Sequence, residues 1–195
     1  MKPNQFFALA DFTSLSKNNM QPIEKQVVRL GTLQDDRAVF RLHYTVLNCE
    51  EMLLSMTPKT GPALNILLEK HPALPPANRR QMVEAGEGFL FTDPTAPAGV
   101  DLWEKLDYVP DINAPDGNRY VRVLETHGTY KETPSRDGLA GVELIASLGI
   151  YEAELEDLKG TFLVTLEIGT PTCKDGGLII LYQGRSIDAG DIEQQ

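Results

Sequence analysis

The clearest alternation of apolar and polar positions runs from residue 38 to residue 48. Every second residue there is apolar and lies on one face of an extended chain: Phe40, Leu42, Tyr44 and Val46. Successive side chains of a strand point to opposite sides, so this period of two indicates a half-buried strand. A second apolar stretch covers residues 25–33, and the polar segment 34–37 separates the two. The pattern predicts a β-hairpin over residues 25–48 whose core face includes Phe40, Leu42 and Val46.

Four other segments are predicted as short helices: residues 49–56, 63–70, 77–84 and 138–148. Apolar residues at helical spacing indicate the second and the fourth. Two glutamates in the first turn favour the first helix, and the preceding prolines favour the start of the third. Pro58 and Pro62 separate the first two of these segments, and Pro72 follows the second. In the fourth segment Asp137 is a candidate N-cap, and Gly149 is the expected end of the helix.

The last third of the chain is dominated by strand patterns. They cover residues 119–130, 150–156, 161–168 and 178–182. The turn 157–160 joins the second and third of these, which places Phe162 opposite the row of Tyr151 and Leu155. Residues 178–182 form an unbroken apolar run, which is typical of a strand buried on both faces.

These elements together predict a single α+β domain over residues 1–195. Its expected architecture is a mainly antiparallel sheet or open barrel with two to four short helices and long Pro-rich loops. Residues 93–118 are interpreted as an elaborated loop region of that domain, because they include apolar side chains that a linker would not need.

The charge of the chain indicates which kinds of partner it can bind. The chain has 18 basic and 28 acidic residues, a net charge of −10. Residues 98–195 account for all of it, since basic and acidic residues balance in 1–97. An acidic surface repels phosphates, so we expect neither sequence-specific nucleic-acid binding nor membrane association. Self-association is the expected partnership, with Arg37, Arg79 and Arg80 of one copy facing the acidic half of the next.

Motifs that bind cofactors or metals are absent from the sequence. It contains no GxxxxGK[ST], GxSxG or HExxH pattern, and Cys49 and Cys173 have no histidine near them at ligand spacing. We therefore expect no cofactor and no metal. Two isolated cysteines are typical of a reducing compartment, so the expected location is the cytoplasm, or an assembly built there.

Two groups of residues remain as candidate sites. Glu125 and His127 lie two positions apart on one strand, and such a pair can act as a general acid and base. Arg29, Arg41 and His43 are expected on the polar face of the hairpin, where cationic groups bind a carboxylate or phosphate. Each group also has an ordinary structural interpretation as the solvated part of a sheet.

The function hypothesis follows from these absences. We expect a non-catalytic structural or accessory subunit that acts through protein–protein surfaces in a larger assembly, such as a tube, shell or virion. The alternative is a small-molecule enzyme that uses a Glu/His/Arg pocket for acid–base chemistry. Whether the protein is an enzyme stays open at this stage, with the balance towards no.

Overall fold

The computed structural model describes residues 6–9, 23–46, 48–71, 77–78, 120–134, 144–153, 160–169 and 177–194. This part of the chain is made of strands, together with one short 3-10 helix. The elements are β1 (Phe6–Leu9), β2 (Ile23–Gln26), β3 (Arg29–Gln34), β4 (Ala38–Tyr44), β5 (Glu51–Pro58), β6 (Leu64–Lys70), β7 (Ala77–Asn78), β8 (Tyr120–Thr133), β9 (Leu144–Ala153), β10 (Thr161–Gly169), β11 (Leu178–Ile187), η4 (Ala189–Asp191) and β12 (Ile192–Gln194).

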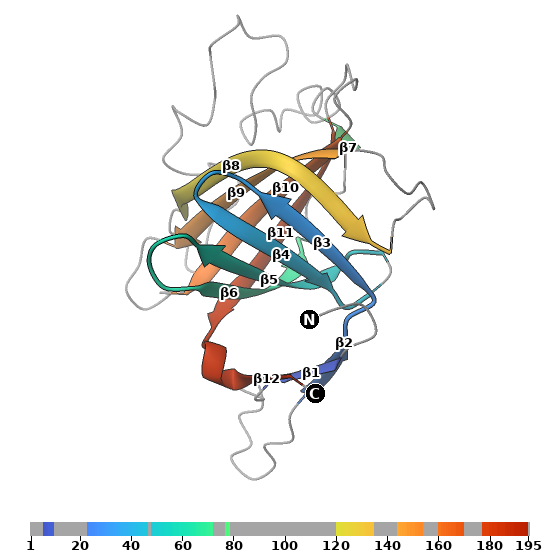
Figure 1. Cartoon of the computed structure of the whole chain (residues 1–195), viewed down its shortest axis with the longest axis vertical. Coiled ribbons are helices and arrows are strands. Elements are labelled where there is room, and N and C mark those ends of the chain that lie inside the picture. The colour runs from blue at the N-terminus through green and yellow to red at the C-terminus, as the bar shows by residue number, and fades with distance from the viewer. Residues whose placement is uncertain are drawn as a thin grey trace, which may run out of the picture.

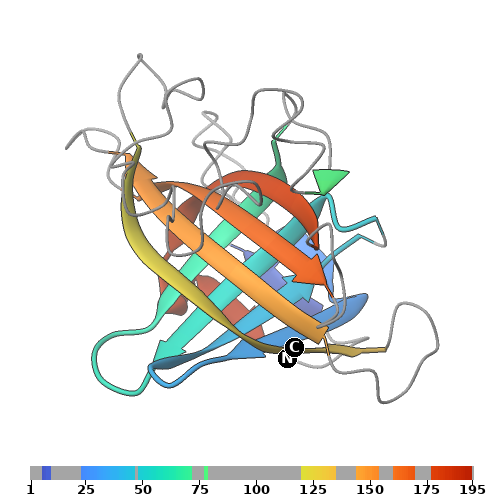
Figure 2. The ribbon, with the colours of Figure 1, turned by 90° about the horizontal axis from the view of Figure 1, so that it is seen from above.

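Eight of these strands form a closed antiparallel barrel (Figure 1). The order around the barrel is β3-β4-β5-β6-β11-β10-β9-β8, and β8 pairs with β3 to close it. The barrel thus consists of two meanders, β3–β6 and β8–β11, joined edge to edge. Seen from above, the yellow and orange strands β8–β10 cross the blue-to-green strands β3–β6 of the opposite wall (Figure 2). A closed barrel leaves no free sheet edge among its eight strands.

A second, three-stranded sheet joins the two ends of the chain in the order β12-β1-β2. It lies outside the barrel, below it in Figure 1. Val27, which directly follows β2, and Ile192, the first residue of β12, pack with Leu53, Leu67 and Ile187 on the outer face of the barrel wall. The terminal sheet is therefore joined to an apolar patch outside the barrel.

The predicted α+β class is wrong for the described residues, which contain strands and no α-helix. Residues 49–56 and 63–70 were expected as helices, yet they form most of β5 and β6. Inward residues do alternate in both strands, but Leu53 and Leu67 face outward and are also apolar. These two leucines pair with each other and belong to the patch beside Val27. Because both faces of these strands carry apolar residues, the alternation of apolar and polar positions is lost. The remaining spacing of apolar residues resembles that of an amphipathic helix.

The other two predicted helices differ in how much of them is described. Residues 144–148 belong to β9, and Gly149 lies within that strand instead of ending a helix. In the segment 77–84 only Ala77 and Asn78 are described, and they form the short strand β7. The predicted loop region 93–118 lies outside the described residues. Within the described part, no helix is long and apolar enough to cross a membrane.

The hairpin prediction is confirmed in its central part. β3 and β4 pair over residues 29–34 and 39–44, and Phe40 and Leu42 are fully buried. The first predicted strand is divided, because β2 belongs to the terminal sheet and β3 to the barrel. Val46 lies beyond β4 and is 37% exposed, so it is not a core residue. The run 178–182 is also confirmed as part of a strand buried on both faces, except at the exposed Leu178.

The barrel interior is packed with apolar side chains from all eight strands. Completely buried members include Leu33, Phe40, Leu42, Leu54, Ile66, Leu148, Val164 and Leu166. Tyr130 fits among them because Gly31 lies beneath its ring: a Cβ at Gly31 would come within 2.8 Å of Tyr130 Cε2. Eight strands enclose an interior just wide enough to be filled by side chains or to hold one small ligand, and in this barrel side chains fill the centre.

Candidate ligand-binding site at one end of the barrel

The two ends of the barrel differ in what fills them. We call the end with Arg29, Tyr44 and Glu132 the closed end, where β3 begins and β4 and β8 end. The opposite end, where β9 ends and β10 begins, we call the open end. The interior of the closed end holds a hydrogen-bonded polar cluster, whereas the open end contains a cavity.

A buried ion pair lies at the centre of the closed end. Arg29 Nε is 3.5 Å from Glu132 Oε1, and the two side chains are 7% and 5% exposed. The Arg29 guanidinium also lies over the Tyr44 ring, 4.6 Å from its centroid, and contacts the Cys49 Sγ. A buried pair is costly to desolvate, so such additional contacts are needed to offset the cost.

Tyrosine hydroxyls extend this cluster across the closed end. Tyr130 donates a hydrogen bond of 2.7 Å to Glu132, and its hydroxyl is 3.1 Å from that of Tyr44. Burial raises the pKa of Tyr130, and the neighbouring Tyr44 and Glu132 raise it further. Tyr130 therefore keeps its proton, which is directed to Glu132, and Tyr44 must be the donor in the bond between the two tyrosines. Tyr182 donates to the Cys49 carbonyl at 2.8 Å.

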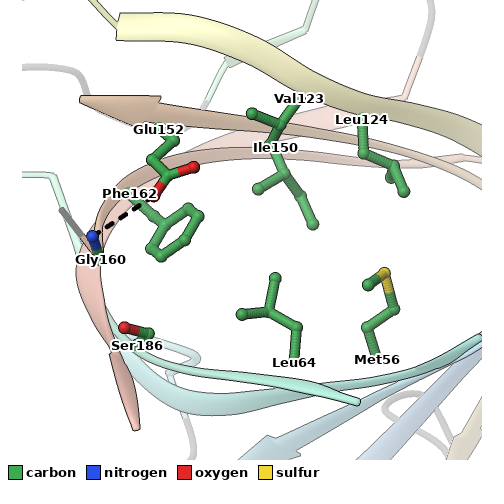
Figure 3. A pocket seen from close by; sticks show the side chains of 9 residues that line it. All are labelled: Met56, Leu64, Val123, Leu124, Ile150, Glu152, Gly160, Phe162 and Ser186. Atoms are coloured by element: carbon green, nitrogen blue, oxygen red, sulfur yellow. Dashed lines mark hydrogen bonds between the residues drawn. The ribbon is translucent and has the colours of Figure 1, made fainter. Parts of the chain in front are cut away.

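The cavity at the open end has a volume of about 530 Å³. This volume is within the range of roughly 300–1,000 Å³ that is usual for small-molecule sites, which often occupy the mouths of β-barrels. Most of its lining is apolar (Figure 3). The lining residues are Met56, Leu64, Val123, Leu124, Ile150, Glu152, Gly160, Phe162 and Ser186.

The polar groups of the cavity gather on one side. Glu152, Gly160 and Ser186 lie together there, while Met56 and Leu124 line the opposite side (Figure 3). Glu152 Oε1 accepts a long hydrogen bond of 3.4 Å from the Gly160 amide, and the Ser186 amide donates to the Gly160 carbonyl at 2.6 Å. Gly160 has a φ of 85°, which favours glycine, and a Cβ there would also collide with the Ser186 hydroxyl.

The turn between β3 and β4 fixes part of the open end. Asp35 accepts hydrogen bonds from the amides of Arg37 and Ala38, at 2.7 and 2.8 Å, and from the Thr126 hydroxyl of β8. Burial alone would raise the pKa of Asp35, but these hydrogen bonds and one from the Arg37 side chain lower it to about 2. The ionised carboxylate thus ties the hairpin turn to the β8 strand.

The structure separates Arg29 from Arg41 and His43. Arg29 pairs with Tyr44 and points into the barrel, whereas Arg41 and His43 lie on its outer face. Arg41 is exposed and donates to Thr57 at 3.3 Å. His43 is 2% exposed, and within the described residues its Nδ1 atom has no hydrogen-bond partner. Burial, with a smaller effect of Arg41 among the charges nearby, lowers the pKa of His43 to about 4, so the ring is neutral at pH 7.

Glu125 and His127 do share one face of β8, as their spacing predicts, but that face is the outer one. From Leu124 onward the inward row of β8 is Leu124, Thr126, Gly128 and Tyr130, so Glu125 and His127 point outward. Neither Glu125 nor His127 lines the cavity. Arg37 is nearby and exposed: it donates to the Glu125 carbonyl at 2.6 Å. Arg79 and Arg80 lie outside the described residues.

Sequence reasoning missed Glu152 as a candidate because it assigned the wrong pairing to the β9–β10 hairpin. The expected turn 157–160 places Phe162 opposite Leu155, but Phe162 pairs with Glu152. This change of register moves Glu152 from the outer to the inner face. Glu152 is the one charged residue of β9, and the alternation alone did not assign its direction.

In the described part of the chain, no group of three or more His, Cys, Asp or Glu side chains is placed to hold a metal ion. Comparisons with protein-family models, curated proteins and solved structures give no match to this chain.

Proposed function

We propose that this protein binds a small, mainly apolar molecule in the cavity at the open end of its barrel. The single observation that carries the proposal is the cavity itself, with a volume of about 530 Å³ and six apolar side chains in its lining. An apolar ligand that enters it removes its own surface and that of the lining from water, which gives roughly 25 cal/mol for each Å² buried.

The rest of the barrel supports a binding role. Its centre is filled, and the closed end is held by the Arg29–Glu132 cluster, so a ligand at the open end meets a wall that is already formed. Preformed sites lose less conformational entropy when a ligand binds. Since Glu125 and His127 lie outside the cavity, binding without catalysis is the function that this geometry favours.

The test is a titration with N-phenyl-1-naphthylamine, a neutral fluorophore that brightens in apolar sites. We expect saturable enhancement with the wild-type protein and displacement of the fluorophore by octan-1-ol. Leu64→Trp places a larger side chain in the cavity and should abolish the signal. Leu178→Trp, at the exposed start of β11 near the closed end, is the matched control and should keep it.

Absence of saturable enhancement with the wild-type protein would overturn the proposal. Equal loss in both tryptophan variants would also count against it, since the effect would then not be specific to the cavity. Circular dichroism of both variants shows whether they fold. The octan-1-ol competition uses only the wild-type protein, so it tests the proposal even if a variant does not fold.

A structural-subunit role is a second candidate, and one feature of the fold favours it. In the described residues, β2 and β12 are the edge strands of the terminal sheet, with no further strand paired to them. Edge strands present unpaired backbone groups to which another chain can add a strand. Together with the uneven charge of the two halves, this supports association of identical chains.

Sedimentation velocity tests the second candidate. Contacts between the basic residues Arg37, Arg79 and Arg80 and acidic residues of another copy should weaken with salt, since the Debye length falls from ~10 Å at 0.1 M to ~3 Å at 1 M. Reversal of Arg79 and Arg80 to Glu should reduce association in the same way. A monomer at low salt and high protein concentration would contradict the assembly role.

A further inference from the structure

Glu152 is a carboxylate in the wall of a mainly apolar cavity. It lies on β9, opposite Phe162 of β10, and is partly buried. Its one hydrogen bond in the described structure is the long one from Gly160 to Oε1, and the second oxygen lies on the cavity side (Figure 3). The other described lining residues contain no basic side chain. Glu152 therefore has no cationic partner among them.

A ligand can supply that missing partner. A carboxylate in apolar surroundings is favoured by a positive charge that also donates hydrogen bonds to it. The Ser186 hydroxyl, on the same side of the cavity as Glu152, offers a second acceptor (Figure 3). Glu152 and Ser186 are the lining residues whose side chains carry an oxygen acceptor.

The apolar side of the cavity, opposite Glu152, determines which chemical groups the rest of the ligand carries. Met56 and Leu124 lie across from Glu152, and Leu64 and Ile150 lie between (Figure 3). A molecule that fills this space has a charged head at the Glu152 side and an apolar body towards Met56 and Leu124. The net charge of −10 adds a long-range attraction for cations and repulsion for anions.

We infer that the cavity selects molecules with an apolar body and a protonated primary amine, with Glu152 as the counter-ion of the amine. This inference rests on the proposed function and specifies its ligand class. An alcohol of the same length keeps the apolar contacts without the charge. A carboxylic acid is ionised at pH 7, and its charge is repelled by Glu152.

The experiment compares octan-1-amine, octan-1-ol and octanoate as competitors of N-phenyl-1-naphthylamine at pH 7 and below their aggregation concentrations. A hydrogen bond between two charged groups is stronger than a neutral one, so we expect the amine to bind about tenfold more tightly than the alcohol. Octanoate should bind more weakly than the alcohol. Glu152→Gln should reduce the ratio of amine to alcohol affinity to about one and leave the alcohol affinity nearly unchanged.

Glu69→Gln is the matched control, because it removes the same charge from an exposed position on β6, away from the cavity. It should leave the preference for the amine intact. Equal affinities of the wild-type protein for amine and alcohol would overturn the inference while the proposed function stands. An equal loss of preference in Glu152→Gln and Glu69→Gln would also overturn it, since general attraction to an acidic surface would then suffice. Failure of the fluorophore itself to bind would instead refute the proposed function.

Discussion

The closed and open ends of the barrel each contain a glutamate carboxylate but surround it differently. At the closed end the buried carboxylate of Glu132 has an arginine 3.5 Å away and a tyrosine hydroxyl at 2.7 Å. At the open end the carboxylate of Glu152 has one amide at 3.4 Å and faces a cavity. A carboxylate with internal partners stabilises the fold, whereas one with no cationic partner among the described cavity residues is available to a ligand.

The largest expected effect comes from breaking the ion pair at the closed end. Glu132→Gln keeps an acceptor for Tyr130 but leaves the buried charge of Arg29 uncompensated. Removing one partner of a buried pair typically costs about 3–5 kcal/mol, and we expect a loss of that size in the free energy of unfolding measured by urea denaturation. Glu152→Gln, in the same assay, should change it by less than about 1 kcal/mol. Similar losses in both variants would remove the distinction between the ends.

A matched pair of leucines tests how tightly the centre and the open end are packed. Leu42 is completely buried in the barrel, so Leu42→Ala should cost about 2–5 kcal/mol. Leu64 is partly exposed and already borders a cavity, so Leu64→Ala should cost only about 1 kcal/mol. The two denaturation midpoints measure this difference. An unchanged midpoint for Leu42→Ala would show that the inner and outer faces of β4 have been exchanged.

A smaller effect is expected at the turn that fixes the open end. Asp35→Asn weakens the hydrogen bonds to Thr126 and to the amides of the turn, and should cost about 1–2 kcal/mol at pH 7. The pKa of Asp35 is about 2 in the folded protein, below its ordinary 3.8. The contribution of the ionised Asp35 to the free energy of unfolding is therefore complete above about pH 4, and it is lost as the pH falls towards 2.

Urea denaturation at pH 7, pH 4 and pH 2 checks this pH dependence. The difference in stability between the wild-type protein and Asp35→Asn should be largest at pH 7 and shrink between pH 4 and pH 2. A difference that stays constant down to pH 2 would mean that the ionised form of Asp35 is not what holds the turn.

The sequence predicted those parts of the fold in which one face alone is buried. Phe40 and Leu42 alternate with Arg41, and this hairpin has the predicted pairing at its centre. The prediction was wrong where both faces of a strand are apolar, as at Leu53 and Leu67, which belong to the apolar patch beside the terminal sheet. That patch depends on contacts between the ends of the chain and its middle, and a local pattern contains no information about them.

The candidate site was harder to predict than the fold, because it depends on register. Arg29 was expected beside Arg41 and His43, but the pairing of Arg29 with Tyr44 turns it into the barrel. Glu152 faces the cavity only because Phe162 is its partner. A shift of one residue in a hairpin moves the residues of the shifted strand to the other face, and the turn sequences alone did not determine the register of either hairpin.

The most direct test of the difference between the two ends is a methyl NMR titration of the protein with octan-1-ol. Binding at the open end predicts saturable shifts of the methyl signals of Leu64, Leu124 and Ile150, which line the cavity. The methyl signals of Leu33 and Leu42, in the filled part of the barrel, should not move. The absence of saturable shifts, or shifts of equal size in both groups, would contradict the account.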